Sequence, residues 1–248
     1  AILILINVIL ILGLIFSYTR AAWLSILCAA IIGAIVYFKV NLKLLVSIGF
    51  IALGTLFFQW DNLQMSLAKN THEHTTEAFD EKIQSAANVT TDASNLERIN
   101  RWDCAIEMFK KKPWLGFGPG TYAFEYAAFQ DPENLTIIST NFGDMGNAHS
   151  EYLGALSESG LIGMLLFLAI VAAVFYSSIT LYYKYPKNND VKILIMGIIV
   201  SLASYFIHAF LNNYLDTDKA AVPVWAMCAM VVTMTIQLNT NDPAIKKD

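Results

Sequence analysis

The stretch GLIGMLLFLAIVAAVFYSSITLYY, residues 160–183, decides the fold class of this chain. It contains no Asp, Glu, Lys or Arg, and a transmembrane helix requires about 20 consecutive and largely apolar residues. A helix that is apolar around its whole circumference belongs among lipid or other helices rather than on a water-exposed surface. The stretch therefore predicts a membrane-spanning helix and an all-α integral membrane protein.

Five further apolar runs flank this stretch and predict about six transmembrane helices in all. The runs are residues 1–16, 21–38, 42–58, 191–211 and 221–238. The first begins inside apolar sequence, with no Met, no basic n-region and no small-residue cleavage site. We therefore interpret it as a truncated spanning helix rather than a signal peptide, and expect the chain to be the C-terminal part of a longer protein.

A polar insert, residues 59–159, separates the first three runs from the last three. Charged residues are 15% of the chain, against about 25% in soluble domains, and most of them lie between Asp61 and Glu158. This distribution is typical of a membrane protein with one large water-exposed loop. The net charge of −4 and the scattered Lys and Arg residues provide no basic block for nucleic acid.

The orientation follows from the short connections, because cytoplasmic loops carry an excess of Lys and Arg. In a six-helix arrangement one side collects Lys39, Lys43, Lys184, Lys187, Lys192, Lys246 and Lys247. We expect that side to be cytoplasmic, which places the insert and the turn at 212–219 outside. The predicted organisation is transmembrane helices over 1–58, the large outer loop over 59–159, transmembrane helices over 160–238 and a cytoplasmic tail over 239–248.

The insert itself is predicted to be partly helical. Ser94 or Asn95 can cap a helix that runs to about Lys112, where Pro113 ends it. The following Gly116–Gly120 segment has four Gly or Pro residues in five positions, which predicts a tight, irregular turn. The aromatic residues after this turn are expected to pack on the membrane interface. They are Tyr122, Phe124, Tyr126 and Phe129.

Three arginines are candidates for binding an anion. Arg20, in SYTRAAWL, stands between two apolar runs, and a guanidinium is costly to bury in hydrocarbon. It is either a helix-end anchor at the interface or an anion site on the outer side. Arg98 and Arg101 are three residues apart on the predicted helix and share a face, and two guanidinium forks on one face suit a phosphate. The alternative is a solvated pair neutralised by Glu97 and Asp103.

His149 is the candidate for proton transfer. It lies in GNAHSEYL beside Glu151, where a helix that leads into the fourth span is expected to start near Asn147 or His149. A neutral imidazole can accept a proton near neutral pH or donate a hydrogen bond to a phosphate. The alternative is a capping or surface histidine. His208 can bond a neighbouring helix or line a polar cavity that it shares with His149. Asp216 and Asp218, on the outer side, can also reach this cavity.

Metal and nucleotide chemistry find little support in the motifs. His72 and His74 have no evident third ligand, and three scattered cysteines form neither a disulfide framework nor a zinc site. The chain has no GxGxxG, P-loop, GxSxG or HExxH motif. An enzyme built on this chain would therefore handle a phosphate leaving group with Arg and His rather than with Mg²⁺.

The order of several strings resembles the C-terminal part of the O-antigen ligase superfamily, which includes O-antigen polymerases and protein O-oligosaccharyltransferases. The strings are TRAAWL at 19–24, RINRWDCA at 98–105, PWLGFGPGTY at 113–122 and NAHSEYLGALSESGLIG at 147–163. The resemblance covers roughly residues 15–235. The chain departs from the family at Ser150, where the family usually has Asn after the His, so no role is expected of position 150.

The resemblance implies a glycosyltransferase of the GT-C type in the bacterial inner membrane. It would pass a glycan from undecaprenyl diphosphate to a hydroxyl of lipid A core, a growing glycan or a protein on the periplasmic side, with inversion and without a metal or other cofactor. Arg20, Arg98 and His149 match the family's catalytic positions. Residues expected to bind substrate are Arg101, Asn147, Glu151, Gly118 and Gly120.

Two functions of another class remain open from the sequence. A transporter with the same helical scaffold could use His208, Asn212 and Asn213 along a solute path, although a transporter site usually lies near the mid-membrane. A structural membrane protein could bind a partner through the polar segment 61–95. Convergence of Arg20, Arg98 and His149 on one cavity would favour the enzyme.

Overall fold

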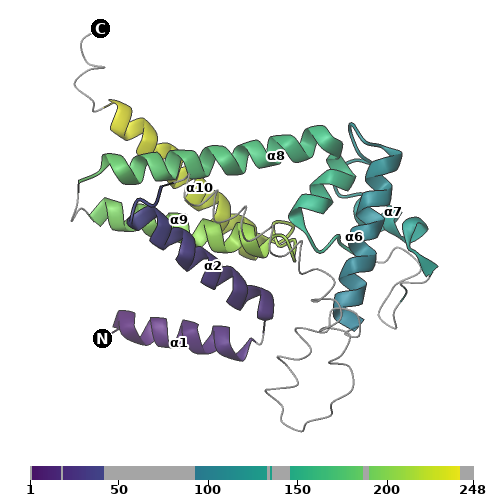
Figure 1. Cartoon of the computed structure of the whole chain (residues 1–248), viewed down its shortest axis with the longest axis horizontal. Helices are drawn as coiled ribbons and strands as arrows, with labels where there is room; N and C mark the ends of the chain where they lie inside the picture. The colour runs from purple at the N-terminus through teal and green to yellow at the C-terminus, as the bar shows by residue number, and fades with distance from the viewer. Residues whose placement is uncertain are drawn as a thin grey trace.

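The computed structural model describes residues 2–17, 19–41, 93–132, 135, 146–186 and 190–240, and all regular structure within these ranges is helical (Figure 1). The helices are α1 (Ile2–Phe16), α2 (Arg20–Tyr37), α6 (Ala93–Lys111), α7 (Tyr122–Glu125), η2 (Tyr126–Phe129), α8 (Glu151–Lys184), α9 (Asp190–His208) and α10 (Asp218–Thr240). The predicted all-α class is confirmed. The predicted third span at 42–58, His72, His74 and the tail lie outside the described residues.

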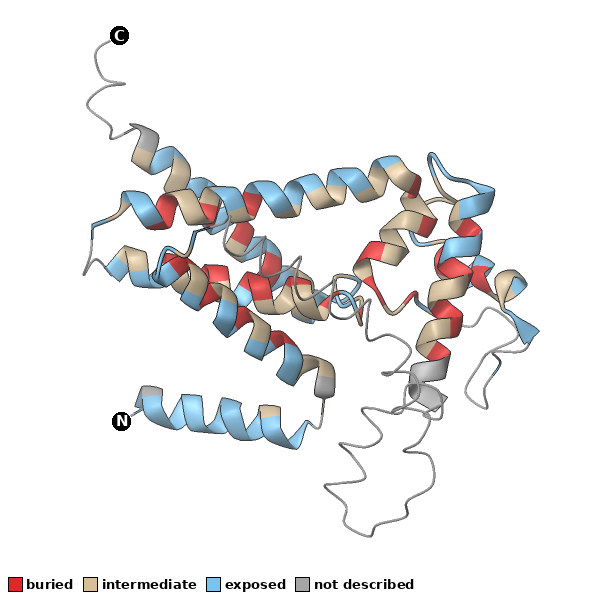
Figure 2. Ribbon diagram, in the orientation of Figure 1, coloured by how far each residue is buried: buried red, intermediate tan, exposed pale blue. Residues whose placement is uncertain are grey.

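Three of the described helices are long and apolar enough to cross a membrane. They are α8, α9 and the Asp218–Leu238 part of α10, while α1 and α2 are apolar but shorter. Large apolar side chains cover the outside of these helices, and in Figure 2 α1 is exposed along nearly its whole length. Leu166 in α8 is 62% exposed and Ile193 in α9 is 70% exposed. Soluble proteins rarely expose such continuous apolar surface, so this surface is suited to contact with lipid.

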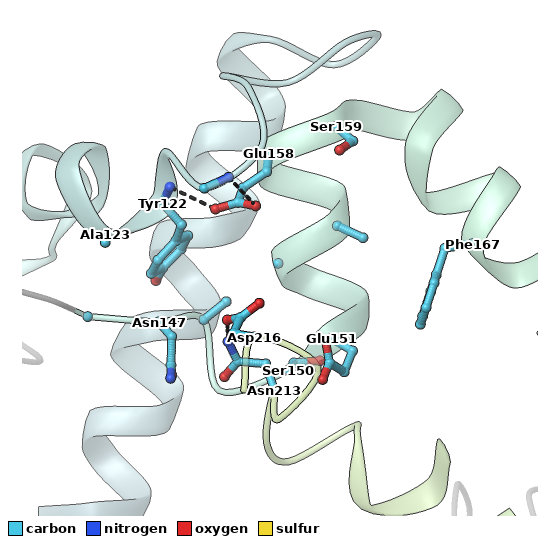
Figure 3. A pocket seen from close by; sticks show the side chains of 15 residues that line it. Tyr122, Ala123, Asn147, Ser150, Glu151, Glu158, Ser159, Phe167, Asn213 and Asp216 are labelled. Atoms are coloured by element: carbon cyan, nitrogen blue, oxygen red, sulfur yellow. Dashed lines mark hydrogen bonds between the residues drawn. The ribbon is translucent and has the colours of Figure 1, made fainter. Parts of the chain in front are cut away.

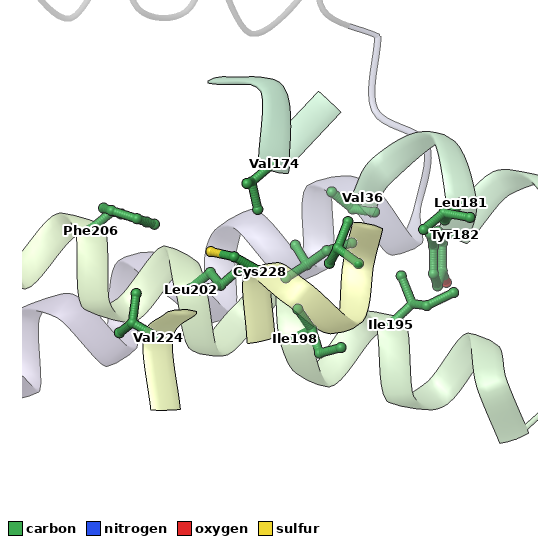
Figure 4. Close-up of a cluster of buried hydrophobic side chains, with 12 residues drawn as sticks. Val36, Val174, Leu181, Tyr182, Ile195, Ile198, Leu202, Phe206, Val224 and Cys228 are labelled. Carbon is green, nitrogen blue, oxygen red and sulfur yellow. The ribbon is translucent and has the colours of Figure 1, made fainter. Parts of the chain in front are cut away.

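The membrane helices share one core, in which α2 packs along α9 while α8 and α10 flank them (Figure 4). Ile199, Leu202 and Val231 are fully buried at its centre. At Gly33 of α2 an added Cβ would lie 2.8 Å from the Val200 Cγ2 atom, so the two helices approach closely there. Small residues at such contacts are typical of helix packing in membranes.

The insert has a second, separate core between α6, α7 and the start of α8. Its buried residues are Cys104, Ala105, Met108, Tyr122, Tyr126 and Ala148. Tyr122 and Tyr126 are only 3% and 0% exposed and their rings stack on each other, so the prediction that they pack on the membrane interface is wrong for both. The two rings instead pack on the apolar face of α6 and bury it. Phe124, at 79%, is the one of these four aromatic residues that is exposed.

Helix α8 is broken at Gly160, which has φ 65° and ψ −167°. The part before the break belongs to the insert, and the part after it is the stretch 160–184 that can span the membrane (Figure 1). The predicted start near Asn147 or His149 is two to four residues early, because the helix begins at Glu151, where the Ser150 hydroxyl caps it by accepting from the Leu153 amide at 3.4 Å. A helix N-terminus leaves its first amides without helical partners, and such a cap satisfies one of them.

The turn at 113–118 docks into this break and caps both halves of α8. The Phe117 and Gly118 amides donate to the carbonyls of Ser157 and Glu158 at 3.1 and 2.8 Å. In return the Leu161 amide donates to the Pro113 carbonyl at 2.8 Å. The two segments can approach this closely because each has a glycine at positive φ, Gly116 in the turn and Gly160 in α8. A Cβ added at either glycine would lie within 2.5 Å of the backbone of the other segment. This contact between residues 113–118 and the break at Gly160, called the joint below, fixes the insert to the membrane-spanning part of α8.

Candidate active site

The start of α8 is tied to the end of α9 and to the turn that follows it. The Glu151 amide donates to the Ala209 carbonyl at 3.0 Å, and the Glu151 carboxylate accepts from the Tyr205 hydroxyl at 2.6 Å and the Leu215 amide at 2.7 Å. The Tyr152 hydroxyl also donates to the Phe206 carbonyl at 2.8 Å. These bonds hold the segment 146–150 against the membrane bundle, so the chemistry carried by that segment lies where the bundle meets the insert.

His149 occupies a strained backbone conformation in this segment, with φ 47°. Residues other than glycine enter this left-handed region at a cost of roughly 1–2 kcal/mol. Two contacts hold it there: its amide donates to the Asn147 side chain at 3.1 Å, and the Trp102 indole donates to its carbonyl at 3.4 Å. Such strain gathers at functional sites when the surroundings enforce it, so it marks His149 as a candidate.

The imidazole of His149 lies among positive charges. Burial is the main cause that lowers the pKa of His149, and the charges of Arg98 and Arg101 lower it further, with Glu97 acting against them. The two arginines are thus within electrostatic reach of the ring. A lowered pKa keeps His149 neutral at pH 7, which is the form that can accept a proton.

Arg101 is not a solvated surface residue, because it is only 5% exposed. Its Nε donates to Glu97 Oε1 at 2.7 Å, and its guanidinium lies 3.9 Å from the centre of the Tyr126 ring. The backbone of Gly146 presses against the same guanidinium, since a Cβ on Gly146 would lie 1.6 Å from Arg101 Nη1. Arg101 therefore anchors segment 146–150 to α6, and its predicted contact with substrate stays a prediction.

Arg98 connects this cluster to the membrane helices. It lies within electrostatic reach of His208 as well as of His149. The His208 ring contacts the Asn212 side chain at 2.9 Å and interacts with the backbone of Ala21. Ala21 follows Arg20, the first residue of α2, so the start of α2 meets the same end of the bundle. The side chain of Arg20 lies outside the described part of the structure.

Glu158 is a polar residue of the site that the sequence reasoning did not single out. Its carboxylate accepts from the Gly120 amide at 3.0 Å and the Tyr122 amide at 2.9 Å, across 38 and 36 residues of sequence. The backbone carbonyl of Glu158 takes the Gly118 amide. The amides of both predicted substrate-binding glycines are thus bonded to Glu158, and substrate binding by these glycines stays a prediction. A carboxylate at this distance in sequence gives no local signal.

A cavity of about 330 Å³ opens beside this arrangement, between the start of α7, the first part of α8 and the turn after α9 (Figure 3). Its polar lining includes Asn147, Glu151, Glu158, Asn213 and Asp216. Gly120, Asn147 and Glu151 were predicted to bind substrate and all three line the cavity, whereas His149, Arg98 and Arg101 do not. Gly146 belongs to both neighbourhoods, because it lines the cavity and touches Arg101.

The described residues contain no group of three or more His, Cys, Asp or Glu that could hold a metal ion. A family model described as O-antigen ligase matches residues 5–168, about two thirds of the chain. The match covers Arg20, Arg98 and His149 and ends inside α8. Searches of curated proteins and of solved structures each found no match.

Proposed function

The chain belongs to the O-antigen ligase family, and from this premise we propose that it is a membrane glycosyltransferase of the GT-C type that moves a glycan from undecaprenyl diphosphate to an acceptor hydroxyl. The observation that carries the proposal is the gathering of Arg98, Arg101 and His149 at one end of the membrane bundle. Placed there, positive charge meets the phosphates of a carrier whose lipid tail stays in the bilayer.

In the proposed reaction the acceptor oxygen attacks the anomeric carbon of the first sugar from the face opposite the diphosphate. The new C–O bond forms as the bond from the anomeric carbon to the diphosphate oxygen breaks, which inverts the anomeric centre. His149 takes the proton of the acceptor hydroxyl, and the bonding electrons leave with the diphosphate. Arg98 and Arg20 stabilise the negative charge that develops on the leaving group, as preorganised donors do in other transfer enzymes.

The location of the reaction follows from the charges of the short connections. Lys184 and Lys192, which flank the connection between α8 and α9, lie at the opposite end of α8 from His149. Because cytoplasmic connections carry the excess of Lys and Arg, the His149 end faces the periplasm in the inner membrane. Lipid A core, a growing glycan and a protein hydroxyl are the acceptor classes for which the reaction is the same.

Complementation tests the proposed function. The full-length gene is expressed in cells that lack their own O-antigen ligase, and surface glycan is separated on gels. A restored glycan ladder on lipopolysaccharide supports a ligase, and longer chains without new capping support a polymerase. If no glycan of the cell changes its carrier, its length or its acceptor, the proposed function is wrong.

The pH dependence of transfer should report His149. Because burial and the nearby arginines lower its pKa, we expect kcat/KM to stay constant at neutral pH and to fall only below the ordinary histidine value of 6.5. The expected slope is about tenfold per pH unit, since one proton is gained and kcat/KM reports the free enzyme. His149→Ala should remove this acidic limb from the residual rate. A midpoint above pH 6.5 would contradict the role of a neutral His149.

A further inference from the structure

We propose that the cavity beside His149 is a subsite for one uncharged or amine-bearing sugar ring, and that it holds no phosphate. The inference rests on the proposed glycosyl transfer and divides its site into two halves of opposite charge. The cationic half is Arg98 and Arg101 beside the neutral His149, and the other half is the cavity of about 330 Å³ lined by Asn147, Glu151 and their neighbours (Figure 3).

The charge of the cavity wall excludes phosphate. Three carboxylates, Glu151, Glu158 and Asp216, line it, and none of its described lining residues is Lys, Arg or His. A phosphate or a sugar carboxylate would meet like charge at short range in a partly enclosed space, where solvent screens poorly. A sugar hydroxyl or an ammonium group, in contrast, donates hydrogen bonds, and carboxylates only accept them.

The polar atoms of the wall are held in place and have room for further donors. Glu158 is fixed through one bond to each carboxylate oxygen, from the Tyr122 and Gly120 amides, and each oxygen can accept a second hydrogen bond. Asp216 Oδ2 accepts from the Asn213 amide group at 2.7 Å. The Asn213 Oδ1 atom is buried and has no hydrogen-bond partner within the described ranges. A buried acceptor of this kind is normally satisfied, and a sugar hydroxyl in the cavity can supply the donor once the Asn213 side chain turns toward it.

Size and shape favour a single ring. The volume lies at the lower end of the range of about 300–1,000 Å³ for small-molecule sites, which combine apolar walls with a few fixed polar groups. The ring of Phe167 provides apolar wall on which the C–H face of a sugar can pack (Figure 3). Since Gly146 lines the cavity and touches Arg101, a sugar in the cavity is next to the cationic half where the diphosphate would lie.

Saturation-transfer NMR on the purified full-length protein tests the subsite without requiring turnover. The probes are methyl glucoside, methyl glucosaminide and methyl glucuronide, which carry a hydroxyl, an ammonium group and a carboxylate. We expect signals from the glucoside, the glucosaminide or both, and none from the glucuronide. Asp216→Ala and Asn213→Ala should each weaken binding about tenfold, as expected for one lost hydrogen bond in a polar site.

Asp218→Ala is the matched control, because Asp218 is exposed just beyond Asp216 and does not line the cavity. It should bind the glycosides as the wild type does. Equal binding by the wild type, Asp216→Ala and Asn213→Ala, with unchanged melting temperatures, would overturn the inference. So would saturation by the glucuronide, or no signal from any probe at concentrations up to their solubility.

Transfer assays then identify the source of the sugar. A raised KM for the acceptor in Asp216→Ala, with the KM for the carrier-linked glycan unchanged, assigns the subsite to the acceptor, and the reverse result assigns it to the donor. An unchanged KM for both substrates overturns the subsite. Failure of the wild type to transfer any glycan would instead refute the proposed function, while glycoside binding would still stand on its own.

Discussion

Replacing Arg98 with alanine is expected to lower the rate of glycan transfer by about 100- to 1,000-fold, the usual effect of removing one donor that stabilises transition-state charge. Arg98 in α6 lies within electrostatic reach of both His149 before α8 and His208 at the end of α9. In the proposed reaction, this positive charge would stabilise the diphosphate most strongly as it leaves. We therefore expect kcat to fall more than the KM for the carrier rises.

Two other variants separate charge at the site from charge elsewhere on α6. Lys110→Ala removes a cation from the same helix, but Lys110 is exposed and pairs with Glu107, so its rate should equal that of the wild type. Arg98→Lys keeps the charge and loses the planar fork, so an intermediate rate is expected. The rates are measured in membranes with matched amounts of protein. An Arg98→Ala rate within about threefold of wild type would contradict the role of Arg98. Such a change is smaller than the roughly 10-fold effect of losing 1.4 kcal/mol of transition-state stabilisation.

Arg101→Ala is a poor test of catalysis, because it should damage the fold as well. The side chains of Arg101 and Glu97 are both almost fully buried, so this variant would take the ion-pair partner from a buried Glu97 carboxylate. It would also remove the cation from the face of the Tyr126 ring. Breaking a buried ion pair by removing one partner typically costs about 3–5 kcal/mol. Loss of activity in this variant would therefore not distinguish binding of the diphosphate from anchoring of segment 146–150.

Gly160→Ala is expected to give a large loss of stability, more than about 3 kcal/mol, since backbone strain and a steric clash add. The new Cβ would lie 2.4 Å from the Trp114 carbonyl carbon and 2.5 Å from its oxygen, and neither backbone can yield without breaking the joint at 113–118. Parting the joint also releases the Leu161 amide from the Pro113 carbonyl. The insert would then lose its fixed position on α8.

Two glycine controls separate the clash from the strain. Gly120 also has a positive φ, 74°, but a Cβ there meets nothing within 4 Å, so Gly120→Ala should cost only the roughly 1–2 kcal/mol of left-handed backbone. Gly197 lies within α9 with open space around it, and Gly197→Ala should cost nothing. Melting temperatures in detergent and protease cleavage within the insert provide the measurement. If Gly160→Ala and Gly120→Ala have the same melting temperature, the joint does not hold the insert rigidly on α8.

The apolar helices were predictable because a long uncharged run has few alternatives to a membrane helix. The predicted runs 21–38 and 191–211 agree with α2 and α9 to within three residues at each end. The break at Gly160 was not predicted, since a glycine at the start of an apolar run is compatible with a continuous helix. It becomes visible only through its partner at Gly116, which lies 44 positions earlier and belongs to another element.

The candidate site was predictable in its residues but not in its surroundings. The Lys residues of the short connections predicted that Arg98, Arg101 and His149 lie on one side of the membrane, and the structure brings the three within electrostatic reach. The burial of Arg101 against Tyr126 was missed, because a pattern of spacing does not show which aromatic ring returns to cover a helix. Glu158 was missed for the same reason, since its partners are amides far away in sequence.

We propose above all that the cluster around His149 transfers a glycan from a diphosphate carrier. The most direct measurement uses the full-length protein in proteoliposomes with undecaprenyl diphosphate-linked glycan and purified lipid A core, and follows released undecaprenyl diphosphate together with glycosylated acceptor. We expect the two products in equal amounts from the wild type, and a rate about 100- to 10,000-fold lower from His149→Ala, the range for loss of a general base. Equal rates from wild type and His149→Ala, or carrier release without a glycosylated acceptor, would contradict the claim.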